Sequence, residues 1–482
     1  MRLTFVTGIV LSLALAGQAP AVNLLVYNTD DSGAGSLRQC IADNAALGGG
    51  SAIIFSNVVI GTITLTSGEL LITNNVAIIG PGANALAVDG NAASSVFHFD
   101  NGITAAISGL TISNGNASGV LNIHSTLMVS NCTISGNSAG GGGGIYNDGL
   151  FGSATLTVIT STFSGNSANS AGGIYNDSYG GSATLTVIAS TFSGNSSGYE
   201  GGGIYNDGQY GSATLTVITS TFSGNSADLG GGIYNHFCAP GNATLSVVAC
   251  TFSGNSASSG GGIYNSASGC PDIRTTFSSH AATNPRDDGG ATLEIGDTIL
   301  NAGATGENIA NLAGTVTSDG FNLSSDNGGG FLTATGDQIN TDPRLGPLAN
   351  NGGPTQTMAL RVGSPAIDQG KNLGTTTDQR GEPRIYIDPN STLPPGGDGA
   401  DIGAYEASKL CVTAAQRAGN HLRLDFTTWL GTNYEVQSRS DLTIGSWASL
   451  PGSTAGNGGI ASTIVSNAFG QSQQFYRIHP VP

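Results

Sequence analysis

The centre of this sequence repeats itself every 29 or 30 residues. Three motifs recur in each period in a constant order: A-T-L-[TS]-V, then T-[IF]-S-G-N-S, then G-G-I-Y-N. Each motif is a short β-prone run between glycine-rich turns, which is typical of one coil of a three-sided solenoid. The G-G-I-Y-N motif ends at Asn147, Asn176, Asn206, Asn235 and Asn265.

The pattern inside the motifs predicts an all-β chain that folds as a right-handed parallel β-helix. Leu156 and Val158 alternate with threonine, as expected for a strand with one buried face. Phe163 and its equivalents should stack in a second apolar column, and Ile145 and its equivalents in a third. Asn166 and its equivalents should form a ladder of side-chain amides that hydrogen-bond along the axis.

The N-terminus has the pattern of a cleaved signal peptide over residues 1–21. Arg2 provides a positive start, an apolar run follows, and Ala19-Pro20-Ala21 is a small-residue cleavage site. That run is short for a membrane span, and no later segment is apolar for about 18 residues. We therefore predict export without a transmembrane helix, to a secreted or outer-surface location.

The mature chain divides into three predicted regions. The β-helix is expected over residues 22–325, with its regular repeats at 130–265. A short helix that starts at Ser36 should cap the first coil. Residues 326–408 and 409–482 should form a second region and a small β-rich, sandwich-like module.

The charge pattern limits the possible partners. Removal of Arg2 with the signal peptide leaves 13 basic and 31 acidic residues, so the formal net charge of the mature chain is 13 − 31 = −18. No lysine or arginine occurs between Arg38 and Arg274. Because nucleic acids and anionic membranes attract clustered positive charge, neither is an expected partner.

The six cysteines lack a C-x-x-C motif, so a zinc site is not expected. An oxidising compartment favours a disulfide, and Cys238 with Cys270 is the predicted pair because both follow the Y-N of successive repeats. Cys132 and Cys250 share one repeat position but are four repeats apart, too far to bond.

Two resemblances extend these predictions. Phe163-Ser164-Gly165-Asn166 fits the F-x-x-N signature of polymorphic outer membrane protein repeats, and the G-G-I-Y motif is similar to that family's G-G-A-I. The resemblance covers 130–265 and implies a pectin-lyase-like β-helix displayed outside the cell, often linked to adhesion. Proteins of that family end in a membrane β-barrel, and this sequence departs from them because it shows no long run of barrel strands.

Residues 319–406 resemble a choice-of-anchor Q domain, which implies a bacterial surface protein. The N-terminal S-L-R-Q run is similar to the N-terminal cap of such proteins. Residues 410–482 resemble the small C-terminal β-sandwich modules of secreted bacterial proteins. The matching segments are Asp319–Leu323, Asp342–Leu348, Asn351–Thr355, Gly363–Asp368, Asp378–Arg384 and Asp401–Glu406.

Asp148, Asp177 and Asp207 each follow the Y-N of a repeat. In one register they would lie roughly 5 Å apart along the axis, where stacked carboxylates repel and invite a cation. Three interpretations stay open: turn residues, a calcium site or catalytic acids.

The tyrosine of each G-G-I-Y-N motif should point outward, because alternation places its isoleucine inward. Such an aromatic strip could bind sugars or proteins, or could be a ladder that stabilises the turn. The tyrosines are Tyr146, Tyr175, Tyr205, Tyr234 and Tyr264.

We interpret the chain as a secreted or surface protein that binds an extracellular glycan or surface protein, more consistent with adhesion than with an enzyme. One alternative is a polysaccharide lyase or glycosidase with its site at the aspartates or on the 266–290 loop. The other is a structural surface-layer component. Fold alone does not choose among them.

Overall fold

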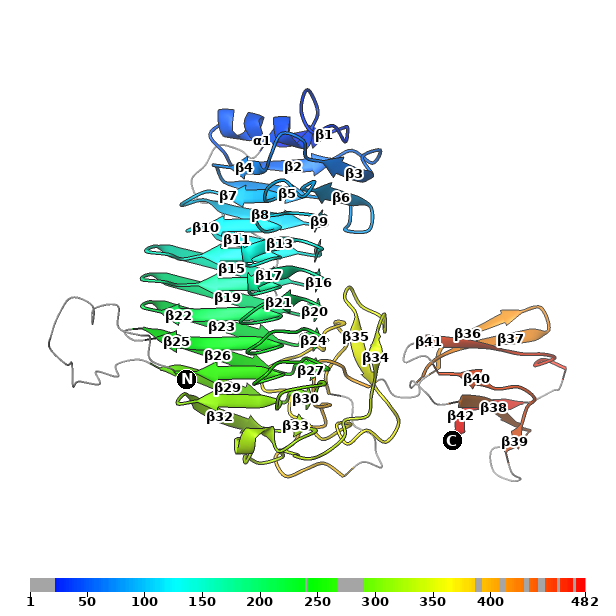
Figure 1. Ribbon diagram of the computed structural model, residues 1–482. Helices are drawn as coiled ribbons and strands as arrows, with labels where there is room; N and C mark the ends of the chain where they lie inside the picture. The colour runs from blue at the N-terminus through cyan, green and yellow to red at the C-terminus, as the bar shows by residue number, and fades with distance from the viewer. Residues whose placement is uncertain are drawn as a thin grey trace.

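The computed structural model describes residues 22–238, 241–267, 290–385, 392–407, 412–428, 433–440, 447–456, 460–470 and 474–481. It confirms an all-β chain dominated by a parallel β-helix (Figure 1). The predicted signal peptide, Cys270 and most of the 266–290 loop lie outside the described residues.

Three long parallel sheets form the sides of the β-helix, and each strand pairs with its equivalent in the next coil. The first sheet, with 11 strands, contains the A-T-L-T-V motif. Its strands are β1 (Asn23–Val26), β2 (Ser51–Phe55), β5 (Val76–Ile79), β8 (Thr104–Ser108), β11 (Thr126–Ser130), β15 (Ser153–Ile159), β19 (Ser182–Ile188), β23 (Ser212–Ile218), β26 (Asn242–Val248), β29 (Ala291–Gly296) and β32 (Thr315–Gly320).

The second sheet has 10 strands and contains the T-F-S segment. Its strands are β3 (Gly61–Thr64), β6 (Leu86–Asp89), β9 (Thr111–Ser113), β12 (Thr133–Ser135), β16 (Thr162–Ser164), β20 (Thr191–Ser193), β24 (Thr221–Ser223), β27 (Thr251–Ser253), β30 (Ile299–Asn301) and β33 (Leu323–Ser324).

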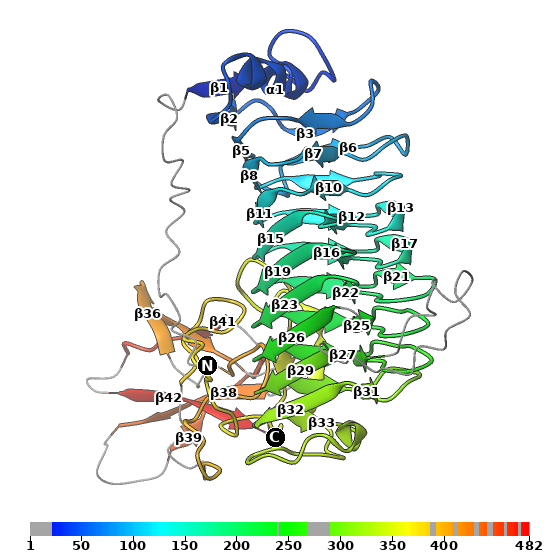
Figure 2. The same ribbon diagram turned by 90° about the vertical axis from the view of Figure 1, so that its left-hand side faces the viewer.

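The third sheet has 9 strands and contains the I-Y-N segment. Its strands are β4 (Leu70–Ile72), β7 (Phe97–Phe99), β10 (Val120–Ile123), β14 (Ile145–Asp148), β18 (Ile174–Asp177), β22 (Ile204–Gln209), β25 (Ile233–Cys238), β28 (Ile263–Ser266) and β31 (Ile309–Leu312). Figure 2 shows the coils stacked in chain order along one axis.

The core consists of the predicted columns. Leu156, Val158 and Ile145 are fully buried, as are their equivalents in the next coils. Phe163, Phe192, Phe222 and Phe252 stack with ring centroids 4.6–4.7 Å apart and nearly parallel planes. Identical apolar side chains in register therefore exclude water from the interior of the repeat region.

A short outer sheet was not predicted. It consists of β13 (Ser138–Gly141), β17 (Ser167–Ser170) and β21 (Ser196–Ser197), which pair in parallel. These strands lie between the second and third sheets in chain order. They add a fourth segment to three coils, and Gly141 of β13 lies against the ring of Tyr175.

Helix α1 (Leu37–Ala46) caps the first coil, as predicted (Figure 1). Ser36 is its N-cap, and its hydroxyl oxygen accepts a hydrogen bond from the Gln39 N–H at 3.1 Å. Leu37 and Ile41 are buried in the same core as the first strands. The cap covers apolar edges that would otherwise be exposed at the end of the stack.

The region after the last coil packs back on the β-helix. It contains a 3-10 turn (Gly328–Gly330) and the antiparallel strands β34 (Leu345–Ala349) and β35 (Thr357–Leu360). Ala359, Ile402 and Tyr405 share a buried cluster with Ile299 and Leu323 of the β-helix. This docked segment, residues 326–385 and 392–407, therefore completes a core together with the last coils.

Polar contacts hold the docked segment on the second sheet. Gln379 Nε2 donates to Thr191 Oγ1 at 2.8 Å, and its Oε1 accepts from Thr221 Oγ1 at 2.6 Å. The Ala404 N–H donates to Thr251 Oγ1 at 3.0 Å. The outward threonines of β20, β24 and β27 are consequently buried.

The C-terminal module is a small pair of antiparallel sheets, as predicted. One sheet holds β36 (Val412–Ala418), β37 (His421–Thr427) and β41 (Ile460–Val465). The other holds β38 (Asn433–Arg439), β39 (Ala448–Ser449), β40 (Thr454–Ala455) and β42 (Phe475–Val481). Phe426, Tyr434 and Ile478 belong to the core between them. In the described part of the chain, no helix is long and apolar enough to cross a membrane.

Candidate functional site

The tyrosines of the G-G-I-Y-N motif form a stack with little free ring surface. Their centroids lie 4.9–5.3 Å apart along the axis, and neighbouring planes differ by 5–27°. The rings point away from the main core, as predicted, but the side chains of Tyr205 and Tyr234 are only 7% and 5% exposed. Ala171 and Leu229 pack against the stack. The binding role of Tyr146, Tyr175, Tyr205, Tyr234 and Tyr264 stays a prediction, and this geometry favours the stabilising ladder.

Two of the phenol groups bind the aspartates of the following coil. Tyr146 OH donates to Asp177 Oδ2 at 2.7 Å, and Tyr175 OH donates to Asp207 Oδ2 at 2.9 Å. Burial raises the pKa of Tyr146 and Tyr175, and the nearby carboxylates raise both further. These phenols therefore stay protonated and act as donors in the network.

The aspartates also shape the corner between the third and first sheets. One oxygen of Asp148 accepts from the Leu150 N–H at 2.8 Å, and Asp177 accepts from the Tyr179 N–H at 2.9 Å. A side chain that bonds the backbone two residues on is the geometry of an Asx turn. Burial raises the pKa of Asp177, while the bonds from Tyr146 and Tyr179 oppose that shift.

The calcium hypothesis gains no support from this arrangement. Both oxygens of Asp177 and of Asp207 already accept hydrogen bonds within the chain. His236 occupies the next position of the column, and its Nδ1 lies 3.2 Å from Asp207 Oδ1. Among the described residues, no group of three or more His, Cys, Asp or Glu could hold a metal ion. Calcium at Asp148, Asp177 and Asp207 stays a prediction.

The predicted amide ladder is present at the turn after the second sheet. Asn137, Asn166, Asn195 and Asn225 each donate from Nδ2 to the Oδ1 of the next asparagine at 2.8–2.9 Å. Asn255 ends the ladder, and its Nδ2 donates to the Phe222 carbonyl at 2.9 Å. All five are buried. These groups satisfy one another and hold the coils in register.

A second amide ladder runs inside the third sheet and was missed. Alternation places the asparagine of I-Y-N inward beside the isoleucine, which was the available signal. Its donor–acceptor distances are 2.6–2.8 Å. Phe99 precedes Asn122 in the column, so Asn122 Oδ1 has no hydrogen-bond partner in the described structure. The ladder consists of Asn122, Asn147, Asn176, Asn206, Asn235, Asn265 and Asn311.

The cysteines fit the sequence argument where they are described. Cys132 and Cys250 are free and buried, as is Cys40. Cys238 is disulfide-bonded. Because Cys270 lies outside the described residues, the pairing of Cys238 with Cys270 stays a prediction.

The docked segment buries an unusual set of charges. Arg384 is fully buried and pairs with Asp297 of the β-helix. Asp401 Oδ1 accepts from the Asp368 N–H at 2.7 Å, and Glu406 Oε2 accepts from the Asp401 N–H at 2.9 Å. Burial raises the pKa of Asp401 and of Glu406, and their proximity raises that of Glu406 further. The arrangement joins chain segments and lies beneath the surface.

An exposed aromatic row at the corner was also missed by sequence reasoning. Phe151, Tyr179 and Tyr210 occupy the turn after the Asx bond in three successive coils. Phe151 is 74% exposed, and the two tyrosines are half-buried. The signal was an aromatic residue in each of D-G-L-F-G, D-S-Y-G-G and D-G-Q-Y-G. We call these three residues the corner row.

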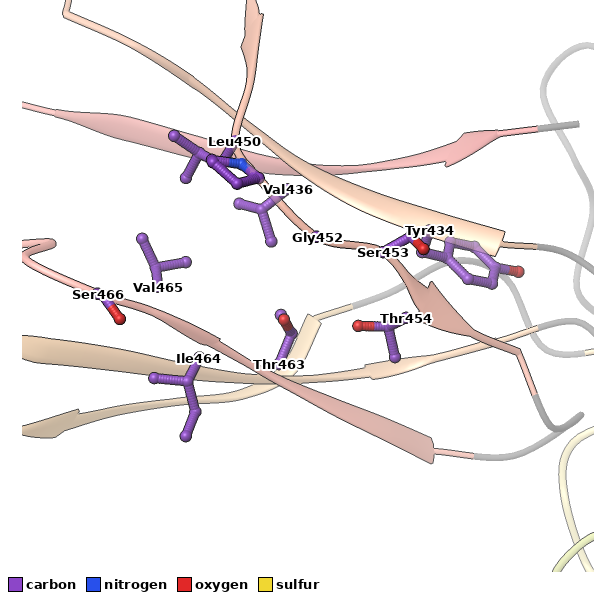
Figure 3. A pocket seen from close by; sticks show the side chains of 11 residues that line it. Tyr434, Val436, Leu450, Gly452, Ser453, Thr454, Thr463, Ile464, Val465 and Ser466 are labelled. Carbon is purple, nitrogen blue, oxygen red and sulfur yellow. The ribbon is translucent and has the colours of Figure 1, made fainter.

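The C-terminal module contains an open cleft of about 300 Å³ (Figure 3). Its lining includes Tyr434 and Val436 of β38, Leu450 just after β39, and Thr463, Ile464 and Val465 of β41. Among the described residues, the lining mixes apolar groups with hydroxyls and contains no carboxylate, amine or histidine.

Comparison with known families bears on the repeats. The family model of the Chlamydia polymorphic membrane protein repeat matches residues 131–148, 189–207, 219–236 and 249–266. Each matched segment begins at the turn before a second-sheet strand, continues through that strand and ends in the following third-sheet strand. No match was found among curated proteins. The central coils of this chain are therefore similar to Chlamydia polymorphic membrane protein repeats on a parallel β-helix.

Proposed function

We propose that this chain is a non-enzymatic extracellular protein that binds glycans or surface proteins, as an adhesin does. The observation that carries the proposal is the match of four coils to a surface-protein repeat, on a solenoid that presents the same side chains coil after coil. Repetition of this kind creates a long surface suited to extended partners.

The burial and the hydrogen bonds of the aspartates that follow Y-N support a binding role rather than catalysis. A glycosidase needs two carboxyl groups that can reach substrate, and a general base needs a free lone pair. The best candidates, Asp177 and Asp207, are 7% and 3% exposed and bond to tyrosine hydroxyls and turn N–H groups. Their arrangement suits a structural role.

The proposed location is the cell surface or the extracellular medium. The signal-peptide pattern, the surface-protein repeats and the disulfide at Cys238 all support it. The resemblance of residues 319–406 to a choice-of-anchor Q domain remains part of this proposal.

Turnover and binding should be measured on the same preparation of residues 22–482. Acidic and neutral polysaccharides would be followed for unsaturated products and for new reducing ends, with and without calcium. Binding to the same polymers and to cell surfaces would be measured as saturation curves.

The expected result is saturable binding without turnover. Turnover that Asp177→Asn or Asp207→Asn abolishes, with the fold intact by circular dichroism, would refute the proposal. Absence of saturable binding to any glycan or cell surface would refute it as well. Ordered self-assembly without binding would instead favour a surface-layer component.

A further inference from the structure

The corner row has free aromatic faces. Phe151 and Tyr179 meet at 87° with centroids 5.7 Å apart, and Tyr179 and Tyr210 meet at 79° with centroids 5.2 Å apart. In the inner tyrosine column neighbouring rings are nearly parallel, so each covers the face of the next. Edge-to-face contacts leave part of each face open, and a ring face is the part of an aromatic side chain that attracts C–H groups and cations.

The backbone holds two of these rings in a strained conformation. Phe151 and Tyr210 have φ angles of 53° and 55°, in the left-handed region. The same register position in the coil between them is Gly180, with φ 67°, and the ring of Phe151 lies over it. An L-residue in this conformation costs roughly 1–2 kcal/mol. Large side chains therefore stand where glycine would be favoured, and such strain is a recognised mark of functional positions.

The setting of the row restricts its partner. The three rings advance by one coil each, so they follow the axis of the β-helix. They are flanked by Ser153 and Ser182, whose hydroxyls lie 3.0 Å apart. The carboxylates of Asp148 and Asp177 shape the same corner, and no lysine or arginine occurs from residue 39 to residue 273. An anionic polymer would be repelled.

The row is also narrow. A stable protein–protein interface needs about 800 Å² on each partner, with a hydrophobic centre. Beside the three rings, Leu150 is the one other large apolar side chain at this corner that is exposed among the described residues, at 37% exposure. A linear polymer with repeating apolar faces and hydroxyl edges fits such a row better than a globular protein does.

We infer that the corner row is a binding site for an uncharged polysaccharide chain that lies along the axis of the β-helix. The rings of Phe151, Tyr179 and Tyr210 stack against the C–H faces of successive sugar units, and the neighbouring hydroxyls bond sugar hydroxyls. The inference rests on the proposed binding function and specifies where that binding occurs and to what class of glycan.

The test compares binding isotherms of residues 22–482 on cellulose, chitin and laminarin, with polygalacturonate as the anionic counterpart. The variant Phe151→Gly/Tyr210→Gly removes two rings and adopts the residue already present at Gly180. We expect it to weaken binding to the preferred neutral polymer by about 5- to 150-fold, since each of the two lost aromatic contacts contributes about 0.5–1.5 kcal/mol. Its thermal midpoint should be unchanged or higher, because strain is relieved. Tyr179→Ser should also weaken binding.

The matched control is Tyr199→Ser, which removes a 61%-exposed tyrosine elsewhere on the coil and should leave binding unchanged. Equal binding by wild type and the double variant would overturn the inference, as would an equal loss in Tyr199→Ser or tighter binding to polygalacturonate. Binding to cells or proteins with none to the neutral polymers would also overturn it, while leaving the proposed function intact. Absence of all saturable binding would remove both.

Discussion

Asn195 lies in the middle of the predicted amide ladder and makes four side-chain hydrogen bonds. Its Nδ2 donates to Asn225 Oδ1 at 2.9 Å and to the Phe163 carbonyl at 3.0 Å. Its Oδ1 accepts from the N–H and the Nδ2 of Asn166 at 3.1 and 2.9 Å. Asn195→Ala removes all four bonds in a site without solvent access.

The cost follows from what the partners retain. Asn225 Oδ1 still accepts from the backbone N–H of residue 195, and Asn166 Nδ2 still donates to the Ile134 carbonyl. The Asn166 N–H loses its acceptor, and the Phe163 carbonyl loses a donor. At about 1–3 kcal/mol for each of these two buried groups left unpaired, Asn195→Ala should destabilise the surrounding coils by about 2–6 kcal/mol.

The assay should resolve individual coils, because long repeat arrays do not unfold as one two-state unit. Hydrogen exchange read by mass spectrometry gives the opening free energy of each peptide. We expect faster exchange in β16, β20 and β24, with β2, β5 and β8 unchanged. Asn169→Ala, the same substitution at an exposed position of the neighbouring coil, is the control.

A second variant tests the chemistry of the ladder. Asn195→Asp keeps an acceptor but places a second oxygen against the Phe163 carbonyl and Asn225 Oδ1. The carboxyl must then be protonated in the folded state, which raises its pKa above the ordinary value near 4. Stability should therefore fall as the pH rises above about 4. If Asn195→Ala costs less than about 1 kcal/mol, or no more than Asn169→Ala, the ladder does not stabilise the coils as argued.

Three further predictions concern the remaining columns and the docked segment. Tyr175→Phe removes the donor to buried Asp207 and should destabilise the chain by about 1–3 kcal/mol in chemical denaturation, without loss of polysaccharide binding. Thr160→Asn should raise the thermal midpoint, because a β-branched residue at φ 47° is strained and asparagine occupies the equivalent position at Asn131, φ 52°; an unchanged or lower midpoint would contradict this. Glu406→Gln should flatten the pH dependence of stability: the raised pKa of Glu406 makes the folded state bind protons more tightly, so wild-type stability falls as pH rises above the ordinary carboxyl range. The exposed Glu382→Gln is its control, and equal pH profiles for wild type and Glu406→Gln would refute the reasoning.

The sequence by itself determined the β-helix and its main columns. A strict period with three β-prone motifs admits one register, since a slip by one residue would turn every leucine and phenylalanine outward. Local preferences also located α1, because Ser36 precedes a run of helix-forming residues and can accept the first N–H bonds. Coil spacing alone excluded a disulfide between Cys132 and Cys250, and both cysteines are free.

Only the tertiary structure decided which outward residues stay exposed. Alternation assigns a side chain to the inside or outside of its own strand, but it does not say what later covers that strand. Ala171 and Leu229 pack against the tyrosine column, and the docked segment covers the threonines of β20, β24 and β27.

The same limit hid the corner row and the pairing of Arg384 with Asp297 under the docked segment. Phe151 and Tyr210 sit at turn positions with left-handed backbone, where sequence patterns favour glycine and say nothing about large side chains. Arg384 and Asp297 are 87 residues apart and meet only because the segment packs back on the last coils. The stability of each coil depends on its neighbours one coil away, whereas contacts between distant segments depend on the whole packed surface. The repeats in the sequence therefore determined the solenoid, and only the folded chain decided which parts of its surface are covered.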